Sequence, residues 1–277
     1  MTPAGSSIFR PDVLRGRAAL VTGGGTGICR GIALALASHG ASVAITSRRA
    51  EHLASTVDEL RALGVGALAH VADVRDPLAA ASAVAAAVEA FGRLDILVNG
   101  AAGNFVCAAE DLSPNGFGTV VDIDLKGTFN VSKAALPALA RQGGTILNIS
   151  ATLHYLGTAA QAHVSAAKAG VDALSRALAV EWGPKGIRVN VIAPGPIADT
   201  EGVRRLLDGE KGARARLLNP MRRFGRISDI ADAAVFLCSD AASFVNGATL
   251  VVDGGQWLAS YRVSGEPGMP ASGDGPM

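Results

Sequence analysis

The sequence lacks the features that would place it in a membrane, in a secretory pathway or on a nucleic acid. No apolar run reaches the roughly 18 residues that a membrane span needs, and the opening residues, MTPAGSSIFRP, contain no apolar signal-peptide region. Lysine and arginine number 25 and aspartate and glutamate 24, so the net charge is only +1. A broad electrostatic surface for nucleic acid or anionic lipid is therefore not expected, and we predict neither a nucleic-acid nor a membrane partner.

Cysteine and charge are also scarce. The three cysteines, Cys29, Cys107 and Cys238, are scattered and odd in number, which is typical of a reduced cytosolic protein. No cluster of cysteine and histidine has metal-ligand spacing, so we expect no metal site. Charged residues make up 18% of the chain and apolar residues 49%, which is enough apolar material for a large buried core.

Short β-branched runs alternate with longer runs rich in alanine and leucine. This alternation predicts parallel strands joined by helices, and several strands are continuous apolar runs, as in a sheet that is covered on both faces. The strands are predicted at residues 18–22, 42–46, 67–71, 94–99, 145–150, 188–193 and 249–252. The helices are predicted at residues 28–38, 50–63, 77–91, 117–141, 163–182, 203–218 and 228–239.

No linker rich in proline, glycine or serine interrupts this rhythm. The fold class predicted for the 277 residues is therefore α/β, with a doubly wound parallel sheet in a single domain. The core is expected at residues 14–260. Residues 1–13 and 261–277 are rich in small and turn-forming residues and are predicted to be mobile tails.

A glycine-rich turn stands where the first predicted strand meets the first predicted helix, and it reads TGGGTGI. Glycines let such a turn tighten and let its backbone approach a phosphate, while the N-terminus of the following helix offers free N–H groups and a positive dipole end. A strand before the turn and a helix after it are the context in which this motif binds a dinucleotide. The expected contacts are Gly23, Gly25, Thr26, Gly27 and Ile28.

The end of the second predicted strand favours NADPH over NADH. An NAD site carries an acidic residue there, which binds the ribose 2′-hydroxyl. This chain has Ser47, Arg48 and Arg49 instead, and a guanidinium suits a 2′-phosphate through its charge and its forked donors. The alternative is that the arginines belong to a solvated start of a helix, although an arginine is mildly unfavourable near a helix N-terminus.

Five motifs resemble, in order and spacing, those of the short-chain dehydrogenase/reductase family. They are TGGGTGI, the ADV of residues 72–74, the NGAAG of 99–103, the AAKAG of 166–170 and the PGPI of 194–197. The resemblance covers about residues 14–260 and implies a seven-stranded Rossmann sheet and a homotetramer. It also implies that certain residues contact the cofactor: Asp73 and Val74 at the adenine, Asn99 and Ala101 along the cleft, Lys168 at the ribose, and Pro194, Gly195, Ile197 and Thr200 at the nicotinamide end.

The usual catalytic set of this family is Asn, Ser, Tyr and Lys, and only the lysine is present, as Lys168. The tyrosine position, four residues before the lysine, holds Val164. The serine position holds Ala151, and the asparagine position holds Asp124. Ordinary carbonyl–alcohol chemistry needs a hydroxyl acid beside the carbonyl oxygen, and neither Val164 nor Ala151 can supply it.

This replacement pattern is similar to that of the peroxisomal-type 2,4-dienoyl-CoA reductases, which also lack the tyrosine. The motifs that carry the likeness lie at residues 101–105, 122–132, 151–153, 178–184 and 193–202. The resemblance implies NADPH-dependent reduction of an acyl-CoA substrate in fatty-acid β-oxidation. It implies that Asp124 and Lys168 hold a water that delivers a proton, and that Asn104 and Phe105 lie beside the thioester and the acyl chain.

Some roles stay open. A carboxylate that faces an ammonium stays ionised, so Asp124 is expected to orient the water rather than to be the acid, and Asn104 is the candidate donor to the thioester oxygen. Tyr155 could be an acid or a wall of the substrate site. His163 could touch the substrate or lie at the rim of the cleft.

Two other functions compete with the dienoyl-CoA reductase: a reductase of another enone or keto substrate, and a non-catalytic NADPH-binding protein. The chain ends in Gly-Pro-Met rather than in a peroxisomal tripeptide of the SKL type. We therefore expect a cytoplasmic location.

Overall fold

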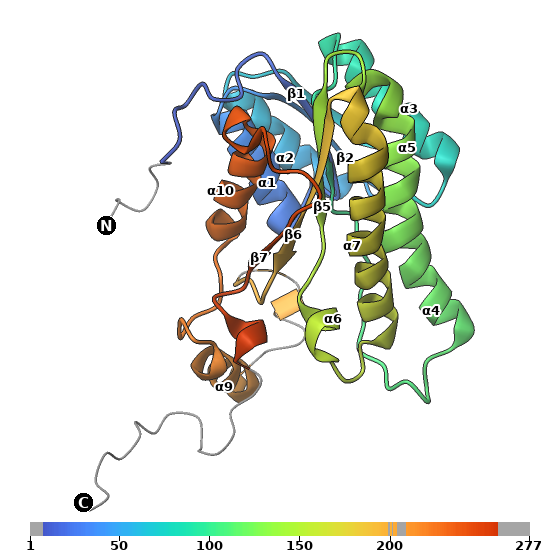
Figure 1. Cartoon of the computed structure of the whole chain (residues 1–277), viewed down its shortest axis with the longest axis vertical. Coiled ribbons are helices and arrows are strands. Elements are labelled where there is room, and N and C mark those ends of the chain that lie inside the picture. The colour runs from blue at the N-terminus through green and yellow to red at the C-terminus, as the bar shows by residue number, and fades with distance from the viewer. Residues whose placement is uncertain (1–7, 199, 201, 204–208, 260–277) are drawn as a thin grey trace, which may run out of the picture.

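Seven parallel strands form one sheet in the computed structural model, in the order β3-β2-β1-β4-β5-β6-β7 (Figure 1). The structure describes residues 8–198, 200, 202–203 and 209–259. The strands are β1 Ala18–Thr22, β2 Ser42–Ser47, β3 Ala67–Val71, β4 Ile96–Asn99, β5 Gly144–Ile149, β6 Ile187–Pro194 and β7 Thr249–Val252. The strand order reverses between β1 and β4, and in such sheets ligands bind beyond the carboxyl ends of the strands at that point.

Helices cover both faces of the sheet (Figure 1). They are α1 Gly27–Ser38, α2 Glu51–Ala62, α3 Pro77–Phe91, α4 Pro114–Val121, α5 Gly127–Leu139, α6 Leu153–Leu156, α7 Ala162–Trp182, α9 Gly209–Leu218 and α10 Ile227–Cys238. The apolar residues of α1, α2 and α10 pack in one cluster, and those of α3, α5 and α7 pack in another. The predicted doubly wound α/β fold is confirmed.

The strands are continuous apolar runs because each alternate residue enters a different core. Ala19 and Val21 of β1 belong to the cluster under α1, α2 and α10, whereas Leu20 belongs to the cluster on the other face. Successive side chains of a strand point to opposite faces, so a sheet with two covered faces needs apolar residues at every position. Fully burying a leucine or isoleucine side chain contributes about 1.5–3 kcal/mol.

The helix predicted over 117–141 is wrong as a single helix. It consists of α4, a π-helical turn at Asp122–Lys126, and α5. A π-helical turn inserts one extra residue and so rotates the side chains that follow it. Asp124 lies within this turn and is 1% exposed.

Several other boundaries also differ from the prediction. The short helix α6 was not predicted, and of the predicted helix 203–218 the structure gives α9 from Gly209, with residues 204–208 outside the described part. Residues 1–7 and 260–277 of the expected tails also lie outside it, whereas Phe9 and Val13 pack against the core. Among the described residues, no helix combines the length and apolar character that a bilayer span requires.

Candidate active site

The turn between β1 and α1 is built for close approach of the backbone. Gly23 has a φ of +70°, and a Cβ at this position would lie 3.0 Å from the carbonyl oxygen of Gly100. A Cβ at Gly25 would lie 2.1 Å from the carbonyl oxygen of His52. Only glycine fits such positions without displacing its neighbours. The turn is therefore packed between the loop after β4 and the first turn of α2, at the carboxyl edge of the sheet.

The other predicted residues of this turn divide between the cleft and the core. Thr26 is the N-cap of α1 but makes no side-chain capping hydrogen bond, and its side chain lines the cleft. Gly27 begins α1 with a φ of +55°. Ile28, by contrast, is partly buried, and its side chain packs against the core. Its predicted contact with the nucleotide would therefore come from its backbone.

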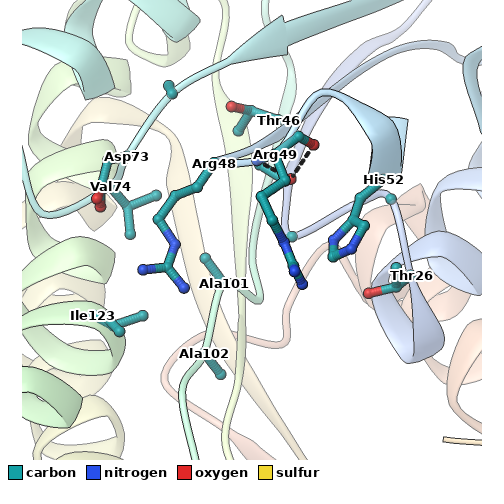
Figure 2. A pocket seen from close by; sticks show the side chains of 14 residues that line it. Thr26, Thr46, Arg48, Arg49, His52, Asp73, Val74, Ala101, Ala102 and Ile123 are labelled. Carbon is teal, nitrogen blue, oxygen red and sulfur yellow. Dashed lines mark hydrogen bonds between the residues drawn. The ribbon is translucent and has the colours of Figure 1, made fainter. Parts of the chain in front are cut away.

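A pocket opens at the carboxyl ends of β1 to β4 (Figure 2). Figure 2 shows Arg48 and Arg49 reaching into it from the loop after β2, with His52 beyond Arg49. Nine of its fourteen lining residues are among the predicted cofactor contacts. The other five were not predicted, because they come together only through the fold: Thr46, His52, Ala72, Ala102 and Ile123. The whole lining is Gly23, Gly25, Thr26, Thr46, Ser47, Arg48, Arg49, His52, Ala72, Asp73, Val74, Ala101, Ala102 and Ile123.

The charges around this pocket are arranged by short local contacts. The Ser47 hydroxyl donates to the carbonyl oxygen of Arg49 at 3.1 Å and accepts from its N–H at 3.2 Å, which fixes the loop. Asp73 is held by Arg75 through contacts as short as 2.6 Å, and this guanidinium lowers the pKa of the Asp73 carboxyl below its usual range. The carboxylate of Asp73 is thus already paired, and two arginines give the pocket its positive charge.

The side chain of Asn99 is held by hydrogen bonds within the protein, and its contact with the cofactor stays a prediction. Asn99 is buried, and its Nδ2 donates to Ser132 Oγ at 2.9 Å and to Asn148 Oδ1 at 2.8 Å. Its side chain therefore joins β4 to β5 and α5. Ala101 lines the pocket instead, and its N–H donates to Thr22 Oγ1 at 3.1 Å.

The segment after β6 carries the cofactor residues predicted for the nicotinamide end. Pro194 ends β6, and a Cβ at Gly195 would lie 2.6 Å from the Cβ of Asp253. Ile197 is buried, and the Thr200 hydroxyl donates to its carbonyl oxygen at 2.7 Å. These residues lie at the carboxyl end of β6 and so extend the same edge of the parallel sheet, although none of them lines the pocket of Figure 2.

A buried ion pair lies between the π-helical turn and α7. Lys168 Nζ is 3.1 Å from Asp124 Oδ2, and the two side chains are 8% and 0% exposed. Asp124 Oδ1 accepts from the N–H of Gly103 at 2.8 Å, and Lys168 Nζ donates to the carbonyl oxygen of Ile149 at 3.0 Å. Oδ2 lies outside hydrogen-bond geometry with any described donor. It therefore has an unused acceptor position within the buried pair.

Burying two charges costs several kcal/mol for each ion, even when they are paired. A buried pair at the carboxyl edge of a parallel sheet is therefore a candidate for catalysis rather than for stability. The position at which the family usually has its catalytic tyrosine is apolar. It holds Val164, which is 3% exposed and packs with Val120 and Leu153. The structure thus brings Asp124 and Lys168 together and provides no hydroxyl at the tyrosine position.

Tyr155 lies on α6, and its hydroxyl donates to Asp172 Oδ2 at 2.9 Å. The same oxygen lies 3.0 Å from His154 Nε2. Burial and the hydrogen bond to Asp172 raise the pKa of Tyr155 above its ordinary value. A phenol that is directed at a buried carboxylate in this way is not placed to protonate a substrate. Sequence reasoning missed this cluster, whose only signal is that Asp172 follows Lys168 by one helical turn.

The loop after β4 carries the residues predicted at the substrate. Asn104 is exposed, and its side chain makes no hydrogen bond within the described part of the chain. The Phe105 ring, 40% exposed, stacks on His163 with ring centroids 4.3 Å apart. His163 is fully buried. It therefore supports Phe105 from behind, and its contact with a substrate stays a prediction. Gln161 Nε2 also holds this loop, through the carbonyl oxygen of Phe105 at 3.3 Å.

No group of three or more histidine, cysteine, aspartate or glutamate residues in the described ranges could hold a metal ion. The three cysteines, all within those ranges, are free thiols.

Known proteins resemble the chain over most of its length. The sequence model of the family described as enoyl-(acyl carrier protein) reductase matches residues 23–256. A peroxisomal 2,4-dienoyl-CoA reductase of Arabidopsis thaliana, named as (3E)-enoyl-CoA-producing, is 51% identical over 92% of this chain and 89% of its own. A Bacillus subtilis protein named probable 2,4-dienoyl-CoA reductase, (2E)-enoyl-CoA-producing, is 46% identical over 88% of this chain and 98% of its own. A crystal structure from Sinorhizobium meliloti, titled as a short-chain alcohol dehydrogenase, superposes with a TM-score of 0.86 at 42% identity, covering 91% of this chain and 100% of its own.

Proposed function

The chain belongs to the short-chain dehydrogenase/reductase family, and we propose that it reduces 2,4-dienoyl-CoA thioesters to 3-enoyl-CoA thioesters in fatty-acid degradation, with NADPH as the reductant. The observation that carries this proposal is the buried pair of Asp124 and Lys168, beside which the usual tyrosine and serine positions hold Val164 and Ala151. The relatives named as 2,4-dienoyl-CoA reductases support the substrate class.

The residues at the carboxyl edge fit a phosphorylated dinucleotide. The glycine-rich turn permits close approach of a pyrophosphate, and Arg48 and Arg49 bring two positive charges to the pocket where the adenosine ribose would lie. Lys168 would hold the nicotinamide ribose, and Ile197 and Thr200 would hold the carboxamide. When bound, NADPH supplies a hydride to the δ carbon of the dienoyl thioester.

The protein then has two tasks. Hydride addition at the δ carbon moves an electron pair through the conjugated system to the thioester oxygen, and the resulting dienolate must be stabilised and protonated at the α carbon. Asn104 is placed in an exposed loop next to Gly103, whose N–H is fixed by Asp124. Its free amide N–H is our candidate donor to the dienolate oxygen.

Proton delivery is assigned to a water held by Asp124 and Lys168. Asp124 Oδ2 retains the capacity to accept a hydrogen bond, so it can orient a water whose other proton points to the α carbon. The α carbon takes that proton, and solvent returns one to the hydroxide that remains. The nearby ammonium of Lys168 stabilises this transient negative charge. The net change is one hydride and one proton added, with the remaining double bond at the 3-position.

We propose a homotetramer, because Phe129 on α5 and Val180 on α7 are apolar and 42% and 78% exposed, as expected of helices that meet another subunit. Sedimentation equilibrium of the purified chain should give the mass of four subunits. The cytoplasmic location stays a prediction, and the Arabidopsis relative is named as peroxisomal.

The test of function is NADPH oxidation by the purified protein with a trans-2,trans-4-dienoyl-CoA, with the product identified by NMR. We expect a 3-enoyl-CoA, and loss of turnover in Asp124→Ala and in Lys168→Ala. Asp122→Ala is the matched control, because Asp122 lies in the same π-helical turn but forms a solvent-exposed pair with Lys126. NADPH binding without turnover of the dienoyl-CoA would overturn the proposal. Reduction of a 3-ketoacyl-CoA instead would indicate a different reductase.

A further inference from the structure

The pocket of Figure 2 contains a histidine for which neither the glycine-rich turn nor the arginines account. His52 is the second residue of α2, and its side chain lines the pocket between Arg49 and Thr26 (Figure 2). Its backbone is fixed, because its carbonyl oxygen lies against Gly25 so closely that a Cβ there would approach to 2.1 Å. The imidazole is therefore carried on the first turn of a helix that is packed directly on the phosphate-binding turn.

The charged residues in and around this pocket come from three elements. Arg48 and Arg49 belong to the loop after β2, and Glu51 on α2 lies 3.9 Å from Arg49 Nε. Asp73, beyond the end of β3, is paired with Arg75. Each nearby carboxylate thus faces an arginine, and the surplus charge on the pocket side is positive. A doubly charged anion suits this surrounding better than a neutral hydroxyl does.

We propose that His52 binds the 2′-phosphate of NADPH together with Arg49, and that it is a specificity-determining residue for the phosphorylated cofactor. This inference rests on the proposed function, because it requires NADPH rather than NADH to be the reductant. A phosphate monoester presents three strong acceptor oxygens. A guanidinium that binds as a fork engages two of them, so one oxygen is left for another donor. An imidazole N–H donates to one of them in either protonation state. The 2′-hydroxyl of NADH offers neither that charge nor those oxygens.

Two small probes isolate the contact. Adenosine 2′,5′-bisphosphate carries the 2′-phosphate and adenosine 5′-monophosphate lacks it, and their binding is measured by titration calorimetry without any turnover. The proteins are the wild type, His52→Ala, His52→Gln and the control His70→Gln. His70 is a histidine of β3 that contacts Ser82 and does not line the pocket. Thermal unfolding of each unliganded protein checks that the fold is intact.

We expect His52→Ala to raise the Kd for the bisphosphate about 10- to 100-fold, as for loss of one hydrogen bond to a charged group. The Kd for the monophosphate should stay within about twofold. His52→Gln should recover part of the loss, because its amide also donates.

An unchanged Kd for the bisphosphate in His52→Ala would overturn the inference, and so would an equal loss for both probes. A wild type with no preference for the bisphosphate would instead overturn the proposed use of NADPH. The two failures are thereby distinguished.

Discussion

Removing one charge of the buried pair should lower the free energy of unfolding strongly. The losses of the two single variants, added together, should exceed the loss in the variant that lacks both charges. Asp124→Asn keeps the shape of the side chain and an acceptor for Gly103, and Lys168→Met keeps most of the stem. Each single variant leaves one buried charge without its partner, which costs about 3–5 kcal/mol. At 3.1 Å the attraction between the charges is about 5 kcal/mol for an effective dielectric constant of about 20. Much of it is offset by desolvation, so we expect a coupling free energy of about 2–3 kcal/mol.

The assay is equilibrium unfolding in urea of the wild type, both single variants and the double variant, at one fixed protein concentration because an oligomer's apparent stability depends on it. The exposed pair of Asp122 and Lys126 serves as a matched cycle, with an expected coupling of about 0.3–0.5 kcal/mol. Additive effects in the buried cycle, within about 0.5 kcal/mol, would refute this account of the pair.

The same four proteins separate stability from catalysis. Turnover of the dienoyl-CoA should fall about 100-fold or more in each single variant, because general acid–base assistance contributes that much. The double variant should stay as slow as the singles even where its stability partly recovers. A double variant with restored turnover would show that the pair supports only the fold.

Three further outcomes follow from single contacts. Tyr155→Phe should leave kcat nearly unchanged but lower the free energy of unfolding by about 1–3 kcal/mol, because Asp172 loses a buried donor. A large loss of kcat with the dienoyl-CoA would instead identify Tyr155 as the acid. Gly100→Ala should cost about 1–3 kcal/mol in urea unfolding, since its Cβ would lie 2.1 Å from Cys29 Sγ, and Cys29→Ala should restore most of it; no rescue would exclude that clash as the cause. Burial raises the pKa of Cys29 and Cys238 to about 12, so mass spectrometry should find both unmodified by iodoacetamide at about pH 8, and rapid native labelling would contradict this burial.

The layered architecture could be predicted because local sequence signals agree with it. α3 begins and ends where predicted, at Pro77–Phe91, since Asp76 caps its first turn and Gly92 ends it with a φ of +72°. β1, β3 and β7 also match their predicted bounds. These signals lie within a few residues of the boundary that they set, so a single sequence contains them.

Parts of the site could not be predicted, because they depend on residues that are distant in the chain. The partner of Tyr155 is Asp172, on another helix. His52 becomes a pocket residue only because α2 packs on the glycine-rich turn. The hydrogen-bond partners of Asn99 are Ser132 on α5 and Asn148 on β5, which its motif does not contain. The spacing of residues along the sequence does not indicate which distant residues will contact one another.

The π-helical turn at Asp122–Lys126 could not be predicted from the sequence, although it positions a residue of the proposed site. Hydrophobic periodicity over a long window tolerates one extra residue, so the run from α4 to α5 is indistinguishable from one helix. That extra residue sets where Asp124 points, with one oxygen toward Gly103 and the other toward Lys168. A single carboxylate thereby fixes the loop that carries Asn104 and faces the ammonium that would hold the water. Oxygen binding and proton delivery in the proposed reaction are coupled through it, so moving Asp124 by one helical position should impair both together.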